Sequence, residues 1–137
     1  MFYAIIGVMD VARVVQNWLI SADDDLRSVR IAFRGRDYVK ALFWGHLYLE
    51  KLLKAVITKQ TGKHAPYGHA LDVLAAKANL NLQPTQISML DRVTRYNIQA
   101  RYDDHKFTLK KLATREFCQR EIKEIEEFGK WLKSMLK

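Results

Sequence analysis

The chain has 137 residues, of which 49% are hydrophobic and 28% charged, and its formal net charge is +8. This length and balance are typical of one globular domain and exclude a disordered or low-complexity chain. The only cysteine, Cys118, excludes an internal disulfide and a cysteine-built metal site, and a cytoplasmic location is expected. The positive charge favours an anionic partner, nucleic acid above all.

The first nine residues, MFYAIIGVM, are apolar but far fewer than the roughly 20 that cross a membrane. They also lack the basic start and the small-residue cleavage site of a signal peptide. We interpret residues 1–9 as an apolar extension that packs on the core, and residues 10–137 as a single helical domain. No membrane association is expected. The sequence does not decide between Met1 and Met9 as the first residue.

The first half of the chain predicts two long helices. One covers about residues 10–34 and is ended by Gly35, because apolar residues recur along it every seven positions. The next begins near Tyr38 and carries apolar residues on several faces, so we expect it to be central and buried. Its packing seam has alternating spacings of four and three, at Tyr38, Leu42, Gly45, Leu49, Leu52 and Val56.

The second half predicts three more helices. The stretch TGKHAPYGH (61–69) breaks the pattern, and a short helix with Leu71 and Leu74 follows it. Pro84 suits the first turn of a helix that runs to about Arg101 and turns Ile87, Leu90 and Val93 inward. After a polar loop, a long C-terminal helix repeats the seam, at Cys118, Ile122, Ile125, Gly129, Leu132 and Leu136.

No segment alternates with a period of two for long enough to predict a strand. The sequence therefore predicts an all-α, up-and-down bundle of four longer helices plus one short helix.

Several chemistries are excluded by their motifs. The sequence holds no glycine-rich phosphate loop, no serine elbow and no H-E-x-x-H, and none of the four histidines follows a glutamate by three residues. Asp103, Asp104 and His105 are metal-capable, but adjacent loop residues seldom converge on one ion. We expect neither a metal nor another cofactor.

Charged residues on the first two helices have both structural and functional interpretations. Arg27, Arg30 and Arg34 share one helix face and could follow phosphates, although a solvated face balanced by aspartates is favoured. Glu50 stands four residues before Lys54 on the helix that we expect to be buried, so an internal ion pair is favoured over catalysis. His69 could orient the start of the short helix or face a cleft.

The stretch RYNIQARYDDH (95–105) is rich in groups that bind phosphate. Arg101 falls in the last turn of a predicted helix, where a cation complements the helix dipole. A metal-independent ribonuclease needs a base for the 2′-hydroxyl and a cation for the phosphorane. Arg101 with His105 could supply both if they meet at one phosphate. Spacing alone favours a basic helix end.

Four motifs in the same order give the chain a resemblance to the HEPN family (higher eukaryotes and prokaryotes nucleotide-binding domain), over about residues 12–135. They are WLISADDDLRSV (18–29), YVKALFWGHLYLEKLLKAVI (38–57), HALDVLAAKANL (69–80) and YNIQARYDD (96–104). The last resembles the Y-x-x-x-A-R-Y-P ending of one branch, with Asp103 in place of the proline.

The resemblance implies a helical bundle, usually dimeric, that is paired with a minimal nucleotidyltransferase in a toxin–antitoxin-like system. It also resembles the helical domain attached to aminoglycoside nucleotidyltransferases. Many family members are ribonucleases that use R-x4-6-H near a dimer cleft. Here three residues separate Arg101 from His105 and nine separate Arg95 from His105, so neither pair has that spacing.

Three hypotheses follow. The first is a dimeric nucleotide- or RNA-binding module, with Arg95, Arg101 and Tyr102 lining a cleft, His105 nearby, and Glu50, Lys51 and His69 shaping it. The second is a metal-independent endoribonuclease in which Arg101 holds the phosphate and His105 is the acid–base. The third, a helix-turn-helix DNA-binding protein, rests on the short helix, the turn NLNLQ and the helix from Pro84.

Overall fold

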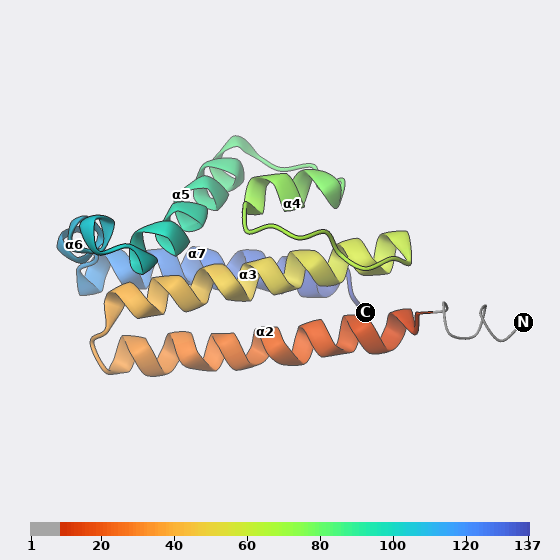
Figure 1. Ribbon diagram of the computed structural model, residues 1–137, viewed down its shortest axis with the longest axis horizontal. Coiled ribbons are helices and arrows are strands. Elements are labelled where there is room, and N and C mark those ends of the chain that lie inside the picture. Colours follow the sequence, from red (N-terminus) through yellow and green to blue (C-terminus); the bar gives the residue numbers. More distant parts are fainter. Residues whose placement is uncertain (1–8) are drawn as a thin grey trace, which may run out of the picture.

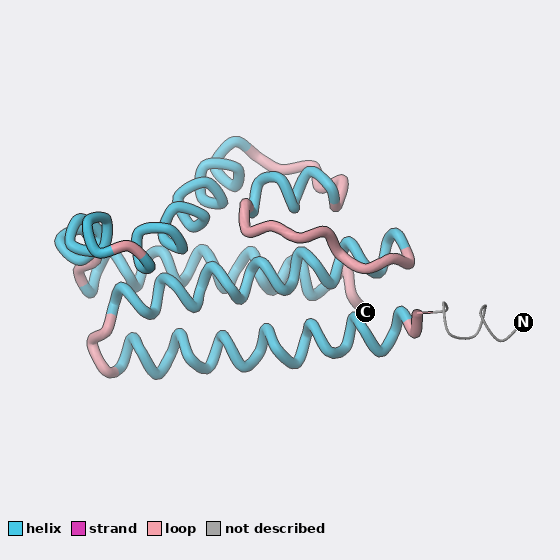
Figure 2. Tube along the Cα trace, viewed as in Figure 1, coloured by secondary structure: helices cyan, strands magenta, loops and turns pink. Residues whose placement is uncertain are grey.

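The computed structural model describes residues 9–137, apart from the side chains of residues 103–106. Within that range the chain forms helices and loops without a strand, as Figure 2 shows. The helices are α2 (Val11–Arg34), α3 (Tyr38–Thr61), α4 (Leu71–Lys77), α5 (Pro84–Arg101), α6 (Asp103–Leu112) and α7 (Arg115–Ser134). The predicted all-α class is confirmed. The predicted packing of the N-terminal extension falls on residues outside the described range, except for Met9.

The four longer helices alternate in direction, as in an up-and-down bundle (Figure 1). α2 and α3 lie antiparallel over their length, and α7 packs against α3 and runs in the same direction as α3. α5 crosses α3 diagonally, the short α4 covers the second half of α3, and α6 lies at the end where α2 turns into α3. None of the described helices is long and apolar enough to cross a membrane.

The helix boundaries follow from local chemistry. Asp10, Asp37 and Thr114 each precede a helix, and each side chain accepts a hydrogen bond from the backbone N–H three residues later. Such caps satisfy amide groups that the first turn leaves without a partner. α3 ends at Gly62, whose φ of 69° lies in the left-handed region that glycine adopts without strain.

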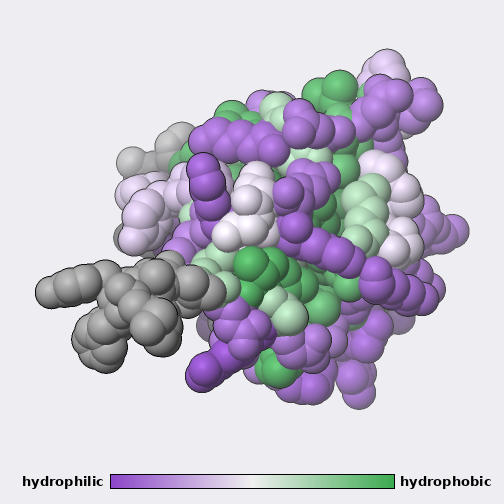
Figure 3. Space-filling model, turned by 90° about the vertical axis from the view of Figure 1, so that its right-hand side faces the viewer, coloured by the Kyte–Doolittle hydropathy of each residue, from purple (hydrophilic) through white to green (hydrophobic). Residues whose placement is uncertain are grey.

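The core centres on α3, which was predicted to be the buried helix. Leu42, Leu49, Leu52 and Leu53 are fully buried, and so is Tyr48 at 1% exposure. Two glycines of the predicted seams allow α3 and α7 to approach closely, because Gly45 faces Ile125 and Gly129 faces the ring of Tyr48. Figure 3 shows the end of the bundle where α2 begins, with polar side chains around a smaller apolar area.

Two local predictions were wrong. The polar loop expected after Arg101 is largely the helix α6, which buries Leu109 completely in the core cluster. Tertiary packing thus supports a helix that the polar sequence did not indicate. Ile87, predicted to face inward with Leu90 and Val93, is 49% exposed. It lies roughly 120° around α5 from Val93, outside the buried stripe.

Gly129→Ala should destabilise the protein, because an added Cβ would lie 2.5 Å from a ring carbon and from the hydroxyl oxygen of the buried Tyr48. We expect the free energy of unfolding to fall by about 1–3 kcal/mol, the usual effect of overpacking. Urea denaturation measures it, with Lys130→Ala at the neighbouring exposed position of α7 as the control. An equally stable Gly129→Ala variant would show that the α3–α7 contact is loose.

Candidate functional site

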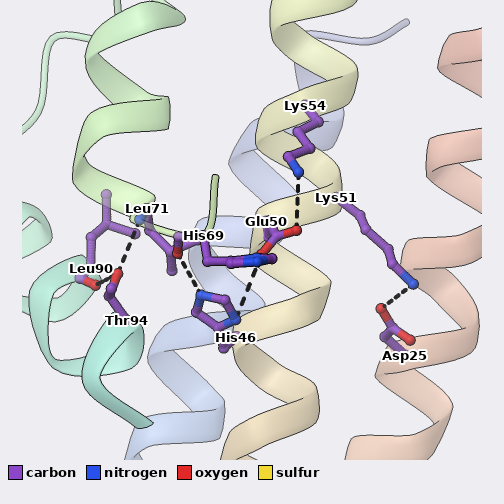
Figure 4. A network of polar contacts seen from close by, with 9 residues as sticks. All are labelled: Asp25, His46, Glu50, Lys51, Lys54, His69, Leu71, Leu90 and Thr94. Atoms are coloured by element: carbon purple, nitrogen blue, oxygen red, sulfur yellow. Dashed lines mark hydrogen bonds and ion pairs between the residues drawn. The ribbon is translucent and has the colours of Figure 1, made fainter. Parts of the chain in front are cut away.

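A cluster of four polar side chains joins the middle of α3 to the loop that enters α4. His46, Glu50 and Lys54 follow one another at intervals of four on α3, and His69 reaches the same point from the loop (Figure 4). Glu50 is only 6% exposed. Its Oε2 lies 3.2 Å from Lys54 Nζ and its Oε1 lies 2.8 Å from His69 Nδ1. We call these four residues the clasp.

His46 attaches the backbone of the loop to α3. Its fully buried ring donates from Nε2 to the carbonyl oxygen of His69, at 2.7 Å. Burial lowers the pKa of His46, because the charged form loses its hydration, and the nearby positive charge of Arg101 acts in the same direction. The neutral form of His46 therefore persists to lower pH than in an ordinary histidine, and it donates to the loop.

The ring of His69 is held on one side and open on the other. Nδ1 bonds Glu50, while the side chain is 57% exposed. Of the two predicted roles, orienting the short helix falls to another residue, because Thr94 Oγ1 accepts from the Leu71 N–H at 3.0 Å. Thr94 in turn donates to Leu90 of α5. The predicted ion pair of Glu50 with Lys54 is confirmed.

A cleft of about 340 Å³ opens beside the start of α3 and the end of α5. Its walls combine aromatic rings with cations, and they are Val39, Lys40, Phe43, Trp44, Ala100 and Arg101. The rings of Phe43 and Trp44 meet edge to face, with centroids 5.6 Å apart. Lys40 and Arg101 are exposed at the cleft. Cations with aromatic faces are the combination that binds phosphate and base together.

The cleft and the clasp are neighbours on α3. Lys40, Phe43 and Glu50 are separated by three and seven residues, so they share one face of the helix. Phe43 and Glu50 stand about 10 Å apart along the helix axis. Arg101 forms part of the cleft from the end of α5.

The other predicted site residues are dispersed. Arg95 pairs with Asp91 at 3.4 Å and lies roughly 120° around α5 from Arg101. Lys51 points toward α2, away from His69 (Figure 4), and lies 2.8 Å from Asp25, whose pKa is raised by burial.

Tyr102 is exposed at the junction of α5 and α6. The side chain of His105 lies outside the described part of the chain.

The arginine row of α2 adds no site, and the side chains of the metal-capable Asp103, Asp104 and His105 lie outside the described part of the chain. Arg27 pairs with Asp24, and Arg30 Nη2 lies 3.2 Å from Glu126 Oε1 of α7, which supports the solvated face that was favoured. No group of three metal-capable side chains occurs among the described residues.

Sequence reasoning missed Lys40, Phe43 and Trp44. The two aromatic residues stand off the seam of α3, between Leu42 and Gly45, and were assigned to general burial. Part of the cleft was predictable from the sequence. Lys40 stands three residues before Phe43 and four before Trp44, so a cation and a ring share one helix face. The end of α5 that completes the cleft comes from tertiary packing.

Comparison with known proteins supports the fold. The sequence profile of the HEPN domain matches residues 15–135. The crystal structure of the protein TT1696 from Thermus thermophilus is similar, with a TM-score of 0.76 and 19% sequence identity over 93% of this chain and 99% of that chain. At this identity the similarity shows the fold alone. No functionally curated protein matches the chain.

The lowered pKa of His46 predicts a pH-dependent stability. Its contribution is complete above the ordinary histidine pKa of about 6.5, and it is lost as the pH falls through the lower native value, because the unfolded chain binds the proton first. His46→Gln keeps a donor for the His69 carbonyl but cannot titrate. We expect this variant to lose stability less steeply on acidification, by up to about 1.4 kcal/mol per pH unit.

Urea denaturation of both proteins at a series of pH values measures this difference. Parallel curves of unfolding free energy against pH would contradict the assignment of a buried neutral His46.

Proposed function

Because the chain belongs to the HEPN domain family, we propose that it is a nucleotide- or RNA-binding module whose ligand occupies the cleft between α3 and α5. The observation that carries the proposal is the meeting of Phe43 and Trp44 with Lys40 and Arg101 in one cavity of about 340 Å³. The family alone suggests the class of ligand, and the cleft suggests where it binds.

The chemistry of the cleft suits one nucleotide unit of a single strand. The guanidinium of Arg101 offers paired donors to phosphate oxygens, and Lys40 adds a second charge at the opposite wall. The half-buried Trp44 offers a face on which a base stacks. A base inside a duplex cannot reach such a face, so single-stranded RNA is favoured over duplexes. The net charge of +8 accelerates the encounter.

Other predicted binding residues fit this surface to different degrees. His69 belongs to the adjoining clasp and Tyr102 directly follows Arg101, so both can extend the surface. Lys51 and Arg95 form ion pairs with Asp25 and Asp91, away from the cleft. The alternative of an endoribonuclease that uses Arg101 and His105 shares the cleft through Arg101.

Two further parts of the proposal concern assembly. We propose that the module forms a homodimer and acts in the cytoplasm as partner of a minimal nucleotidyltransferase-like protein, in a toxin–antitoxin-like pair. The support is the resemblance of YNIQARYDD (96–104) to the branch that is paired with such enzymes.

For this assembly, we expect light scattering after size-exclusion chromatography to give about twice the monomer mass of 16.0 kDa. We also expect the protein to co-purify with a nucleotidyltransferase-like protein encoded by a neighbouring gene. A monomer at micromolar concentration that leaves such a protein unbound would remove this part of the proposal and leave the cleft untouched.

The binding proposal predicts weaker RNA binding after two single changes. Fluorescence anisotropy with a labelled single-stranded RNA oligonucleotide measures Kd. Trp44→Ala should weaken binding roughly 5- to 150-fold, which corresponds to the loss of about 1–3 kcal/mol of stacking. Arg101→Ala should also weaken it and reduce the salt slope by about 0.7, the value for one phosphate contact in a single strand.

Arg13→Ala is the matched control, since Arg13 is an exposed arginine on the first turn of α2, at the opposite end of the bundle. Unchanged binding by both cleft variants, with circular dichroism confirming the fold, would reject the cleft as the site. Tighter binding to duplex DNA than to single-stranded RNA would favour the helix-turn-helix alternative instead.

A further inference from the structure

A second hollow, of about 570 Å³, opens at the end of the bundle where α2 turns into α3 and where α6 also lies (Figure 1). We call it the end pocket. Its wall runs from Gly35 to Lys40, through the turn and the first residues of α3, and is completed by Lys110 and Ala113 at the end of α6. Val39 and Lys40 also line the cleft between α3 and α5. The two hollows are therefore neighbours that share one part of their walls.

The end pocket is basic. Arg36, Lys40 and Lys110 line it with exposed side chains, and Asp37 is the one carboxylate among the described residues of its wall. Asp37 is engaged within α3, because it accepts from the Lys40 N–H at 3.3 Å and lies 3.8 Å from Lys40 Nζ. Among the described side chains, neither Arg36 nor Lys110 lies within salt-bridge distance of a carboxylate. A phosphate would therefore meet two cations without displacing a described acidic partner.

The backbone holds Arg36 in a conformation that arginine seldom adopts. Its φ is 63°, in the left-handed region, while the preceding Gly35 has an ordinary φ of −79°. The N–H groups of Arg36 and Asp37 donate to the carbonyl oxygens of Phe33 and Ala32, at 3.1 and 2.8 Å. Glycine is usual at this position of a helix end, because it has no Cβ to meet the backbone. The chain thus carries an arginine where the fold favours glycine, and strained positions of this kind gather at binding sites.

An aromatic ring stands at the wall of the end pocket. Tyr38 is half-buried there, and its ring centroid lies 5.6 Å from that of Phe33. The guanidinium of Arg115 lies over the ring of Phe33, also at 5.6 Å, and adds a further cation near the turn. The end pocket therefore repeats the combination of cations and an aromatic ring that characterises the cleft.

We propose that the end pocket is a second phosphate subsite, which takes the RNA strand where it leaves the cleft past Lys40. This inference rests on the binding function proposed above. Arg36 and Lys110 bind the phosphate, and Lys40 stands between the two subsites. The ligand is accordingly a single-stranded oligonucleotide and not a mononucleotide, because one nucleotide unit would fill only the cleft.

A single strand suits two adjoining hollows of this kind. It repeats a phosphate at every nucleotide, and its unpaired bases stack on separate rings while a basic groove follows the backbone. Trp44 offers such a ring in the cleft, and Tyr38 offers one in the end pocket. Lys40 lies where the walls of the two hollows join, so positive charge continues from one to the other.

The decisive comparison is between Lys110→Gln and Lys111→Gln. The two lysines are exposed neighbours in the last turn of α6, and of the two Lys110 belongs to the wall of the end pocket. Both changes lower the net charge by the same amount, so the general attraction of a polyanion falls equally. Fluorescence anisotropy with a labelled eight-nucleotide RNA, at a series of salt concentrations, measures Kd and its salt slope. Lys110→Gln should raise Kd and reduce the slope by about 0.7, the value for one phosphate contact in a single strand. Lys111→Gln should leave both near the wild-type values.

Arg36→Gly separates binding from folding. Glycine suits the φ of 63°, so the urea midpoint of this variant should equal or exceed that of the wild type. RNA binding should nevertheless weaken, with a salt slope reduced by about 0.7. Arg34→Ala is the charge control, because Arg34 is exposed in the last turn of α2 and lies outside the described wall. A merely structural Arg36 would give a lower midpoint and leave the slope unchanged.

Strand length tests the link between the two subsites. Unlabelled RNAs of two and eight nucleotides compete with the labelled strand, and the longer one should compete more strongly against the wild-type protein. The double variant Arg36→Gly/Lys110→Gln should reduce this advantage. Competition by the two-nucleotide RNA should stay near its wild-type strength, because that RNA needs only the cleft. An unchanged advantage of the longer strand would overturn the link.

The outcomes separate the two proposals. Absence of RNA binding by the wild-type protein overturns the proposed function itself. Binding that Trp44→Ala weakens, but that Lys110→Gln and Arg36→Gly leave unchanged, overturns the second subsite and keeps the cleft. Equal losses in Lys110→Gln and Lys111→Gln would show attraction by net charge alone, which also overturns the second subsite.

Discussion

The carboxylate of Glu50 is the constraint on which the middle of the molecule depends. It sits on the most buried helix, where an uncompensated charge would cost several kcal/mol. The chain compensates it twice, with Lys54 one turn further along α3 and with His69 from the following loop. The first partner neutralises the charge. The second requires that residues 62–70 return along α3, which determines where α4 begins.

The path of the loop along α3 also positions the rest of the site. Once the loop lies on α3, the Leu71 N–H meets Thr94, and α5 is fixed at an angle across α3. The last turn of α5 then brings Arg101 to Phe43 and Trp44 and closes the cleft. The cleft therefore depends on the position of α5 against α3, which is fixed by the bond from Leu71 to Thr94 and by the burial of Leu90, Val93 and Tyr96 in the core. Polar and apolar contacts of the core thus determine a surface property together.

The sequence predicts the bundle well because repeated apolar spacing is a local property. The seams of α3 and α7, with Gly45 facing Ile125 and Gly129 facing Tyr48, are readable as alternating intervals of four and three. The need of Glu50 for a partner is also predictable, since apolar residues on several faces of α3 predict that this helix is buried. That the second partner is His69 depends on the path of the loop, which no periodicity encodes. α6 was missed for a similar reason, because the burial of Leu109 is a tertiary contact in a polar stretch.

Electrostatics explains why the basic residues of the chain are not equivalent as ligands for an anion. Arg30, Lys51 and Arg95 each lie within salt-bridge distance of a carboxylate, so an incoming phosphate would have to displace that partner. Arg101 instead lines a cavity with aromatic walls, so the field of its charge acts inside that cavity. Low-dielectric walls strengthen that field at the point where a phosphate would sit. The net charge brings a polyanion to the surface, and the carboxylate partners of Arg30, Lys51 and Arg95 weaken these three cations as competing sites.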